Sequence, residues 1–396
     1  MRRYIIWLFL AVSLTISLTG CWDQVEIEKR GFIIGIAFDL AQKKDEELDE
    51  LKEKTFYKGT YQFVVPSALG QGGSGQGNSS SKAYNNLVVE GETVSEQINR
   101  LAGQTSRTPF AEHLQTIILS ENVVRTPQTC SQILDFLLRD NETRRGIKVL
   151  IAEGEAGAML DIPPIPENLP VMYIDSIAKN SFKNASILSE RKIGTIHEHL
   201  LSKKSFVLPK IQRDGQKINM TGAAVFDGHN TQMVGFINGE ITEGLNMITN
   251  EYKQGSLKIK VEDKPVVYEI KREKSSVKVH VRNKDDIRIY IKIKTEGAIE
   301  ESFASLDYMD LKVLSKVEIA VEKEIERKVA KAIKVFQKDL KVDALGFSGY
   351  LERSDYETWK DIEENWDHGE NYFSKSIIKV QADVIVQTPG AIINSE

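Results

Sequence analysis

Residues 311–340 read LKVLSKVEIAVEKEIERKVAKAIKVFQKDL, and this stretch decides the architecture of the second half of the chain. Apolar side chains recur every three or four residues, and most other positions are lysine or glutamate. The apolar positions are Val317, Val321, Ile325, Val329, Ile333, Phe336 and Leu340. This spacing predicts one long helix with a single apolar stripe. A coiled-coil partner could cover the stripe, but the strands before it also need cover, which favours packing on the protein's own sheet.

Closely spaced strands are expected on the amino-terminal side of this helix. Residues 220–226 and 232–237 flank the turn Asp227-Gly228-His229-Asn230, which is a hairpin signal. Further segments alternate apolar with polar residues, as strands with one buried face do. These segments lie at 257–261, 266–270, 277–281 and 287–293. Together they predict one antiparallel meander with one solvent-exposed face. A final strand is expected at 377–386.

The first half of the chain predicts a mixed α/β unit, because strand-type and helix-type spacings alternate along it. Helices are expected at 93–104, where Thr93 and Glu96 form a capping box, and from Thr126-Pro127 onward. Strands are expected at 31–39, 57–65, 116–120 and 146–152. The expected fold class is therefore α+β: a mixed α/β N-terminal region followed by an antiparallel meander packed against a long amphipathic helix.

These changes of pattern also give the expected domains. A lipoprotein signal peptide occupies residues 1–20, an N-terminal region 21–200 and a C-terminal region 215–390. Glycine and serine fill 67–82, which predicts a flexible loop. Residues 70–75 in this loop match the pattern GxGxxG, but no helix follows to bind a phosphate. We therefore expect no nucleotide site there.

The N-terminus predicts how the protein is attached. Two arginines precede an apolar run of roughly 15 residues, which is short of the roughly 20 that a spanning helix needs. The next residues, Leu18-Thr19-Gly20-Cys21, resemble a bacterial lipobox, in which the cysteine thiol receives a diacylglyceryl group and becomes the first residue after cleavage. Acylated Cys21 would then hold the body on the lipid bilayer. The alternatives are an uncleaved signal anchor or a secretory peptide whose cysteine is accidental.

The charge balance excludes some partners. Lysine plus arginine (52) against aspartate plus glutamate (57) gives a net charge of −5, so the chain lacks the basic footprint of a general nucleic-acid binder. Loss of Arg2 and Arg3 with the signal peptide would change −5 to −7. By net charge alone, the mature body should not lie flat on an anionic leaflet.

No catalytic, cofactor or metal site is predicted. His197-Glu198-His199 would place both imidazoles on one face of a strand, but nothing nearby marks a third zinc ligand. We expect His113 to be a structural hydrogen-bonding residue. Cys130 is expected to be a small buried side chain. With Cys21 assigned to lipid, no intrachain disulfide is possible, because Cys21 and Cys130 are the only cysteines.

Three aromatic residues, Trp359, Trp366 and Phe373, recur at intervals of seven. A helical phase would align them on one side. Packing against the long helix is the expected role, and an exposed patch for a partner is the alternative.

Several motifs, taken in order, resemble the Ger(x)C family of spore germination lipoproteins, the C subunits of nutrient germinant receptors. The resemblance covers the whole mature chain. The N-terminal motifs are Cys21-Trp22-Asp23, Glu26-Ile27, Gly31, Gly35-Ile36-Ala37, Asp39, Glu112-His113, 117–121, Leu134-Asp135-Phe136 and Arg144-Arg145. The C-terminal motifs are 222–226, 233–236, Glu240 and Gly244, then 343–347, Arg353, Trp359, Trp366 and Phe373.

The resemblance implies a three-domain body without known catalytic activity, on the outer face of the cytoplasmic (spore inner) membrane. It implies two partners, a multi-spanning A-type subunit and a transporter-like B-type subunit. Cys21 is the only residue to which it assigns a role. The alternative function is a solute-binding lipoprotein that delivers a ligand to a membrane transporter. Such a protein should have two similar α/β lobes, whereas here the second half predicts a meander and one long helix.

Overall fold

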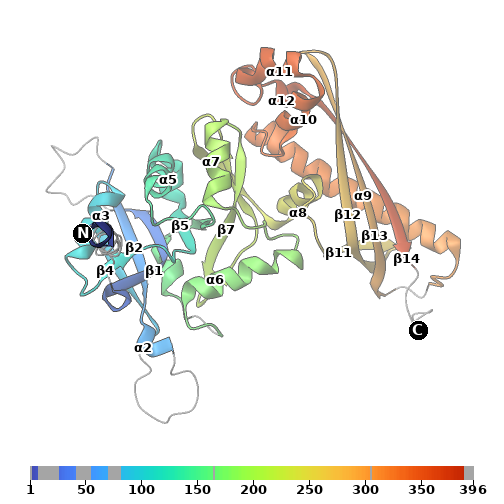
Figure 1. Cartoon of the computed structure of the whole chain (residues 1–396). Coiled ribbons are helices and arrows are strands. Elements are labelled where there is room, and N and C mark those ends of the chain that lie inside the picture. The colour runs from blue at the N-terminus through green and yellow to red at the C-terminus, as the bar shows by residue number, and fades with distance from the viewer. Residues whose placement is uncertain are drawn as a thin grey trace, which may run out of the picture.

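The computed structural model describes residues 2–7, 26–41, 55–69, 82–163, 166–303 and 306–387. The lipobox at 18–21 and the glycine pattern at 70–75 lie outside these ranges, so what was predicted for them stays a prediction. Figure 1 shows an elongated body, with one sheet toward the N-terminal end and a second sheet with a long helix at the other end.

A ten-stranded mixed sheet forms the N-terminal part. Its strands are β1 (Arg30–Leu40), β2 (Tyr57–Val64), β3 (Tyr84–Gly91), β4 (Thr108–Phe110), β5 (Thr116–Ser120), β6 (Lys148–Glu153), β7 (Phe206–Asp214), β8 (Lys217–Asn219), β9 (Ala223–Asp227) and β10 (Gln232–Ile237). Their order is β10-β9-β7-β6-β5-β1-β2-β3, with β4 beside β1 and β8 beside β7. The central pairs β1–β5, β5–β6 and β6–β7 are parallel, and antiparallel strands flank them on both sides. This confirms the mixed α/β prediction.

Helices cover both faces of this sheet. They are α2 (Pro66–Leu69), α3 (Val94–Ala102), α4 (Glu121–Arg125), α5 (Thr129–Arg139), α6 (Pro170–Lys179) and α7 (Ile193–Leu201), with short 3-10 turns η1 (Ile27–Lys29), η3 (Gly157–Asp161) and η4 (Asn180–Phe182). Side chains alternate along a strand, so β5 serves two cores. Ile117 and Leu119 pack with α3, α5 and α7, whereas Ile118 packs with α6 and η3.

The predicted helix starts are partly right. Thr93 caps α3, because its hydroxyl accepts a hydrogen bond from the Glu96 amide at 3.1 Å. Helix α5 begins at Thr129 and not at Pro127, because Gln128 adopts a left-handed conformation with φ 64°. Helices α6 and α7 were not predicted.

The C-terminal part is a four-stranded sheet with helices on one face. Its strands are β11 (Gly255–Val261), β12 (Lys264–Asn283), β13 (Asp286–Ser302) and β14 (Ile377–Gln387), in that order. The helices are α8 (Gly239–Ile248), α9 (Leu311–Lys334), α10 (Phe347–Ser354), α11 (Tyr356–Ile362) and α12 (Tyr372–Lys375), with a π-helical turn η5 (Val335–Leu340) and a 3-10 turn η6 (Glu363–Asn365). The first three strands pair antiparallel, and β14 joins β13 in parallel.

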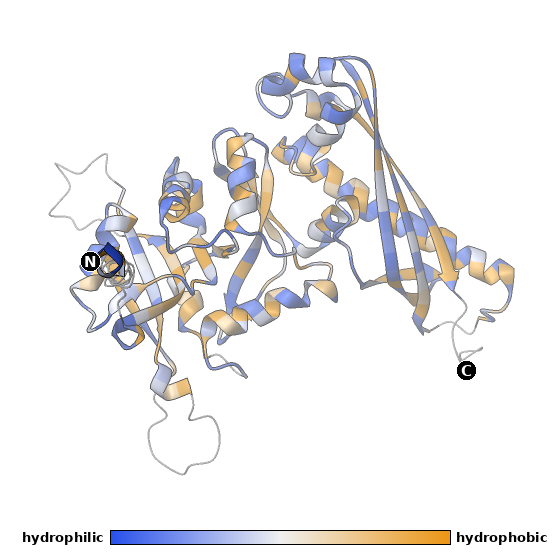
Figure 2. Cartoon of the chain, in the orientation of Figure 1, coloured by the Kyte–Doolittle hydropathy of each residue, from blue (hydrophilic) through white to orange (hydrophobic). Residues whose placement is uncertain are grey.

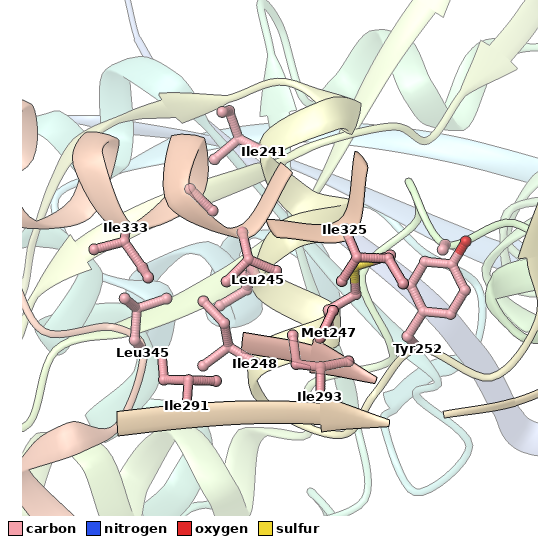
Figure 3. Packing of buried hydrophobic residues seen from close by; sticks show 14 of the residues in the cluster. Ile241, Leu245, Met247, Ile248, Tyr252, Ile291, Ile293, Ile325, Ile333 and Leu345 are labelled. Atoms are coloured by element: carbon pink, nitrogen blue, oxygen red, sulfur yellow. The ribbon is translucent and has the colours of Figure 1, made fainter. Parts of the chain in front are cut away.

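The long helix packs on the protein's own sheet, as expected. Its apolar stripe is buried, from Val317 to Ile333, in one core with the inner faces of β11 to β14. Figure 3 shows part of this core, where Ile325 and Ile333 of α9 lie close to Leu245 and Ile248 of α8 and to Ile291 and Ile293 of β13. Figure 2 shows bands of hydrophobic and hydrophilic colour alternating along the strands, as a half-buried sheet requires.

Helix α9 also covers the free edge of β14. Three glutamates, spaced four residues apart on one side of the helix, accept hydrogen bonds from backbone amides of the strand. Glu326 accepts from Ala382 at 3.1 Å, Glu322 from Val384 at 3.4 Å and Glu318 from Val386 at 3.2 Å. We call these three residues the glutamate ladder.

Two details of the predicted meander are wrong. The hairpin β9–β10 belongs to the ten-stranded sheet, where β9 pairs with β7. The segments 266–270 and 277–281 are one strand, β12, and not two. A bulge between Ile270 and Arg272 shifts the register inside this strand, so the apolar alternation breaks without a turn.

Candidate functional site: the junction between the two sheets

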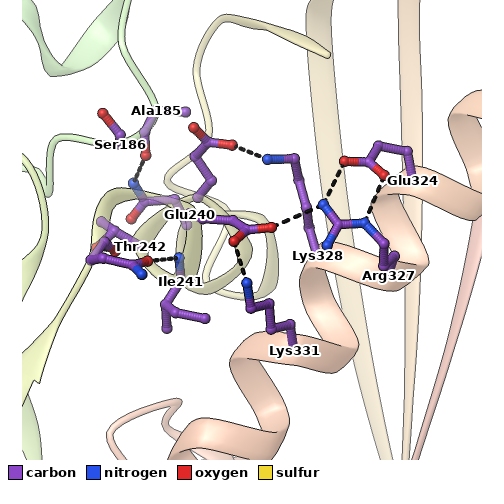
Figure 4. A network of polar contacts seen from close by, with 12 residues as sticks. Ala185, Ser186, Glu240, Ile241, Thr242, Glu324, Arg327, Lys328 and Lys331 are labelled. Carbon is purple, nitrogen blue, oxygen red and sulfur yellow. Dashed lines mark hydrogen bonds and ion pairs between the residues drawn. The ribbon is translucent and has the colours of Figure 1, made fainter. Parts of the chain in front are cut away.

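Helix α8 connects the two parts of the molecule. On one side the Asn246 side chain donates a hydrogen bond to the carbonyl of Ala185 at 2.8 Å, in the N-terminal part. On the other side Glu240 binds Lys331 and Arg327 of α9, and the Glu243 carboxylate lies 2.6 Å from Nζ of Lys328 (Figure 4). Hydrogen bonds from Lys331 and Arg327 hold the pKa of Glu240 below its usual value. The ion pairs and the apolar face of α8 together fix α9 against the N-terminal body.

Gly244 lets α8 and α9 approach closely. A Cβ atom at this position would lie 2.7 Å from the backbone oxygen of Lys328 and 2.8 Å from Cβ of Ala332. These contacts are too short for carbon, and backbone atoms cannot move aside as a flexible side chain can. The close approach therefore requires glycine.

We expect Gly244→Ala to lower the free energy of unfolding by about 1–3 kcal/mol, because it overpacks the α8–α9 contact. Alanine normally favours a helix over glycine, so the sign is opposite to that of helix propensity. Thermal unfolding would measure it. Gly146→Ala is the control, because no atom lies within 4 Å of a Cβ atom there. Equal melting temperatures for the two variants would contradict the packing argument.

A second connection is built around the buried carboxylate of Asp343. Its Oδ1 accepts a hydrogen bond from the Phe347 amide at 3.1 Å. Its Oδ2 accepts from the Ser348 amide at 2.6 Å and from Nε1 of Trp366 at 2.7 Å. Burial raises the pKa of Asp343 to about 7, although these three donors favour the ionised form. Asp343 thus ties the start of α10 to the indole of Trp366.

Asp367 carries this connection across to the first sheet. One of its oxygens accepts from the backbone amide of Asp343 at 2.9 Å and from the Ser205 hydroxyl at 2.7 Å. The Ser205 hydroxyl in turn accepts from the Gly228 amide, in the turn between β9 and β10, at 3.2 Å. Beside it, the rings of His229 and His368 stack with centroids 4.6 Å apart. The hairpin of the ten-stranded sheet is therefore bonded to the C-terminal helices.

The three spaced aromatic residues lie in this connection and are buried. Trp366 packs edge-on against Trp359 at 6.2 Å and lies 5.9 Å from Phe373. Gln337, in the continuation of α9, donates to the backbone oxygen of Phe373 at 2.9 Å. The predicted packing is confirmed, but the single helical phase is wrong, because Trp359 lies in α11 and Phe373 in α12.

The other candidate residues do not form a site together. His197 and His199 lie in helix α7 and not in a strand, so residues two apart point in different directions. Burial, followed by the charges of Arg191 and Lys204, lowers the pKa of His199. His113 is exposed, and its ring lies against Phe32 and Phe110. The expected role was that of a structural hydrogen-bonding residue.

Cys130 is buried in α5, as predicted, and burial raises the pKa of its thiol to about 12. A thiol in this state is a poor nucleophile at neutral pH. Among the described residues, no three histidine, cysteine or acidic side chains gather in a way that could hold a metal ion. None of the helices in the described part of the chain is long and apolar enough to span a bilayer.

One unusual carboxyl group was not foreseen from the sequence. Glu273 follows the bulge in β12 and turns toward the inner face, beside a hollow of about 620 Å³. Both of its carboxyl oxygens are buried without a hydrogen-bond partner. This burial raises its pKa to about 8, and the charge of Lys253 acts in the opposite direction. A charged residue inside an alternating strand normally faces water. The inward direction of the Glu273 side chain follows from the bulge, which the sequence did not reveal.

Comparison with known proteins identifies the family. The model for the spore germination protein N-terminal domain matches residues 23–213, and that for the Spore germination B3/GerAC-like C-terminal domain matches 221–390. Spore germination protein YndF of Bacillus subtilis is 30% identical over 99% of this chain and 98% of its own length. The chain belongs to the Ger(x)C family.

Other relatives extend the match. Spore germination protein B3 of Bacillus subtilis is 24% identical to this Ger(x)C protein, over 89% of the chain and 90% of its own length. The crystal structure of the GerBC protein superimposes with a TM-score of 0.60 at 20% identity, covering 88% of this chain and 97% of that one. The likeness to the GerBC structure concerns the fold.

Proposed function

We propose that this Ger(x)C protein is a non-enzymatic lipoprotein subunit of a spore germinant receptor, needed for nutrient-triggered germination. The observation that carries the proposal is the match to spore germination proteins along nearly the whole chain. The lipobox ending in Cys21 supports attachment by lipid to the outer face of the spore inner membrane. The partners in this proposal are the A-type and B-type membrane subunits.

The junction supports a structural role in such a complex. The carboxylates of Asp343 and Asp367 accept hydrogen bonds from amides, an indole and a hydroxyl of the protein itself. Groups saturated in this way fix two sheets relative to each other, which suits a rigid coupling subunit. The alternative solute-binding function gains no support, because a ten-stranded mixed sheet and a four-stranded sheet around a long helix are not two similar lobes.

Replacing Cys21 by alanine tests the proposal. We expect Cys21→Ala to leave the protein unprocessed or released, because the lipid attachment site is gone. Membrane fractions from spores would show the loss, and germination through this receptor should weaken. Cys130→Ala is the control, since it removes the other cysteine and leaves the lipobox intact. Equal processing and membrane retention of Cys21→Ala would refute the lipoprotein assignment. If the wild-type protein extracted from spore membranes did not co-purify with A-type and B-type subunits, the receptor assignment would be refuted.

A further inference from the structure

The face of the four-stranded sheet that points away from α9 is strongly basic, although the chain as a whole is acidic. Paired positions across β12, β13 and β14 form rows on this face: Lys278, Tyr290 and Lys379 in one, Ser276, Lys292 and Gln381 in the next, and Lys274, Lys294 and Asp383 in the third. We call the five lysines and Tyr290 of these rows the basic face. The positive charge is thus concentrated on one side of the molecule.

Most of this charge is not neutralised within the protein. Asp383 forms an ion pair with Lys292 at 2.6 Å. Lys274, Lys278, Lys294 and Lys379 have no ion pair with any residue in the described ranges, and all four are exposed. Lys274 and Lys294 are direct cross-strand partners, and like charges in such positions destabilise a sheet. A negatively charged surface lying against these lysines would relieve this repulsion.

The composition of the face favours a membrane over a protein surface. Lysine is depleted in protein interfaces, whereas clusters of four to eight basic residues are typical of surfaces that bind anionic lipid. Exposed apolar side chains also lie on the face, where Tyr290, Ile377 and Ile385 are 37%, 46% and 56% exposed. Apolar groups among lysines suit the boundary between headgroups and acyl chains.

We propose that the basic face docks on an anionic lipid leaflet. The inference rests on the proposed function for the presence of a bilayer, and it adds a second, electrostatic contact to the lipid at Cys21. The negative net charge of the body argued against this contact, but a membrane responds to the charge within about 10 Å of its surface, the screening length at 0.1 M salt, and not to the sum over the chain. The body would then lie along the bilayer and not swing from a single tether.

A fluorescent label at Ser276 tests the proposal. Ser276 is exposed in the middle of the basic face, and Cys130 is too buried to compete for a thiol-reactive dye. The full-length acylated protein carrying Ser276→Cys would be reconstituted in phosphatidylcholine vesicles with or without phosphatidylglycerol. We expect a blue shift of an environment-sensitive dye only with phosphatidylglycerol, and we expect high salt to reverse it.

Charge reversal supplies the matched comparison. Lys274→Glu, Lys278→Glu and Lys294→Glu together should abolish the shift. Lys217→Glu, Lys323→Glu and Lys334→Glu together should preserve it, because these exposed lysines lie away from the basic face and the net charge changes equally. Three results would overturn the proposal: the same shift on neutral vesicles, no shift on anionic vesicles, or a shift that requires the A-type or B-type subunit. Flotation of the protein with neutral vesicles reports the Cys21 anchor separately, so its failure would count against the proposed function.

Discussion

Replacing Asp343 by alanine should lower the free energy of unfolding by about 3–5 kcal/mol, because three buried donors would lose their acceptor and each unsatisfied group costs about 1–3 kcal/mol. The donors are the amides of Phe347 and Ser348 and the indole of Trp366. Asp343→Asn should cost less, since it keeps one acceptor oxygen. Chemical denaturation followed by tryptophan fluorescence would measure both.

The same experiment can show whether Asp343 serves the junction or only local packing. Loss of Asp343 should also loosen Asp367 from Ser205, because Asp367 is bonded to the Asp343 backbone. Hydrogen exchange at the β9–β10 turn should therefore rise in Asp343→Ala. Ser354→Ala is the control, since in the described part of the chain the Ser354 hydroxyl bonds only to the carbonyl of Leu351, within its own helix. Unchanged exchange at the turn would mean that the connection between the sheets does not depend on Asp343.

Replacing Glu273 by glutamine should stabilise the protein at alkaline pH and leave it unchanged in mild acid. The pKa of Glu273 is about 8 in the folded chain against 4.5 as its usual value. Between these values the folded protein keeps a proton that the unfolded chain releases, so the folded state loses stability as pH rises. The full difference in unfolding free energy is on the order of 5 kcal/mol above pH 8.

Urea unfolding of both proteins at about pH 4 and about pH 9 would test this, because the linkage predicts little difference below the usual pKa of 4.5 and the full difference above the folded-state pKa. Glutamine mimics the protonated carboxyl in size and charge. Glu269→Gln is the control, since Glu269 lies four residues away on the same strand with its side chain partly exposed. A Glu273→Gln protein that gains no stability over wild type at the higher pH would show that a partner for the carboxylate forms in solution.

The spacing of apolar residues predicted those elements in which the same face is buried along the whole length. The stripe from Val317 to Ile333 meets one continuous core, so its spacing was sufficient to predict α9 and its packing on the sheet. The strand β1 is buried on both faces, and its β-branched and aromatic residues showed this directly. In these elements local pattern and tertiary environment agree.

The junction could not be predicted because its contacts join residues far apart in the chain. Ser205 and Asp367 are separated by 162 positions, and neither stands in a pattern that marks a buried hydrogen bond. The side-chain direction of Glu273 depends on a one-residue bulge, which leaves no trace in periodicity beyond a break in the alternation. Cys21 is the reverse case: its proposed role comes from a local motif alone, and it lies outside the described residues.

The glutamate ladder affects how copies of this protein behave when they are crowded together. An exposed edge strand offers its amides to a strand from another chain and so invites polymerisation. On β14 the amides of Ala382, Val384 and Val386 already have acceptors from α9 of the same chain. A strand from a neighbouring copy would have to displace three carboxylate acceptors, and its backbone carbonyls would be no stronger acceptors for these amides. The edge of β14 is therefore protected against pairing with another strand. Neighbouring copies can lie side by side without forming an intermolecular sheet along this edge.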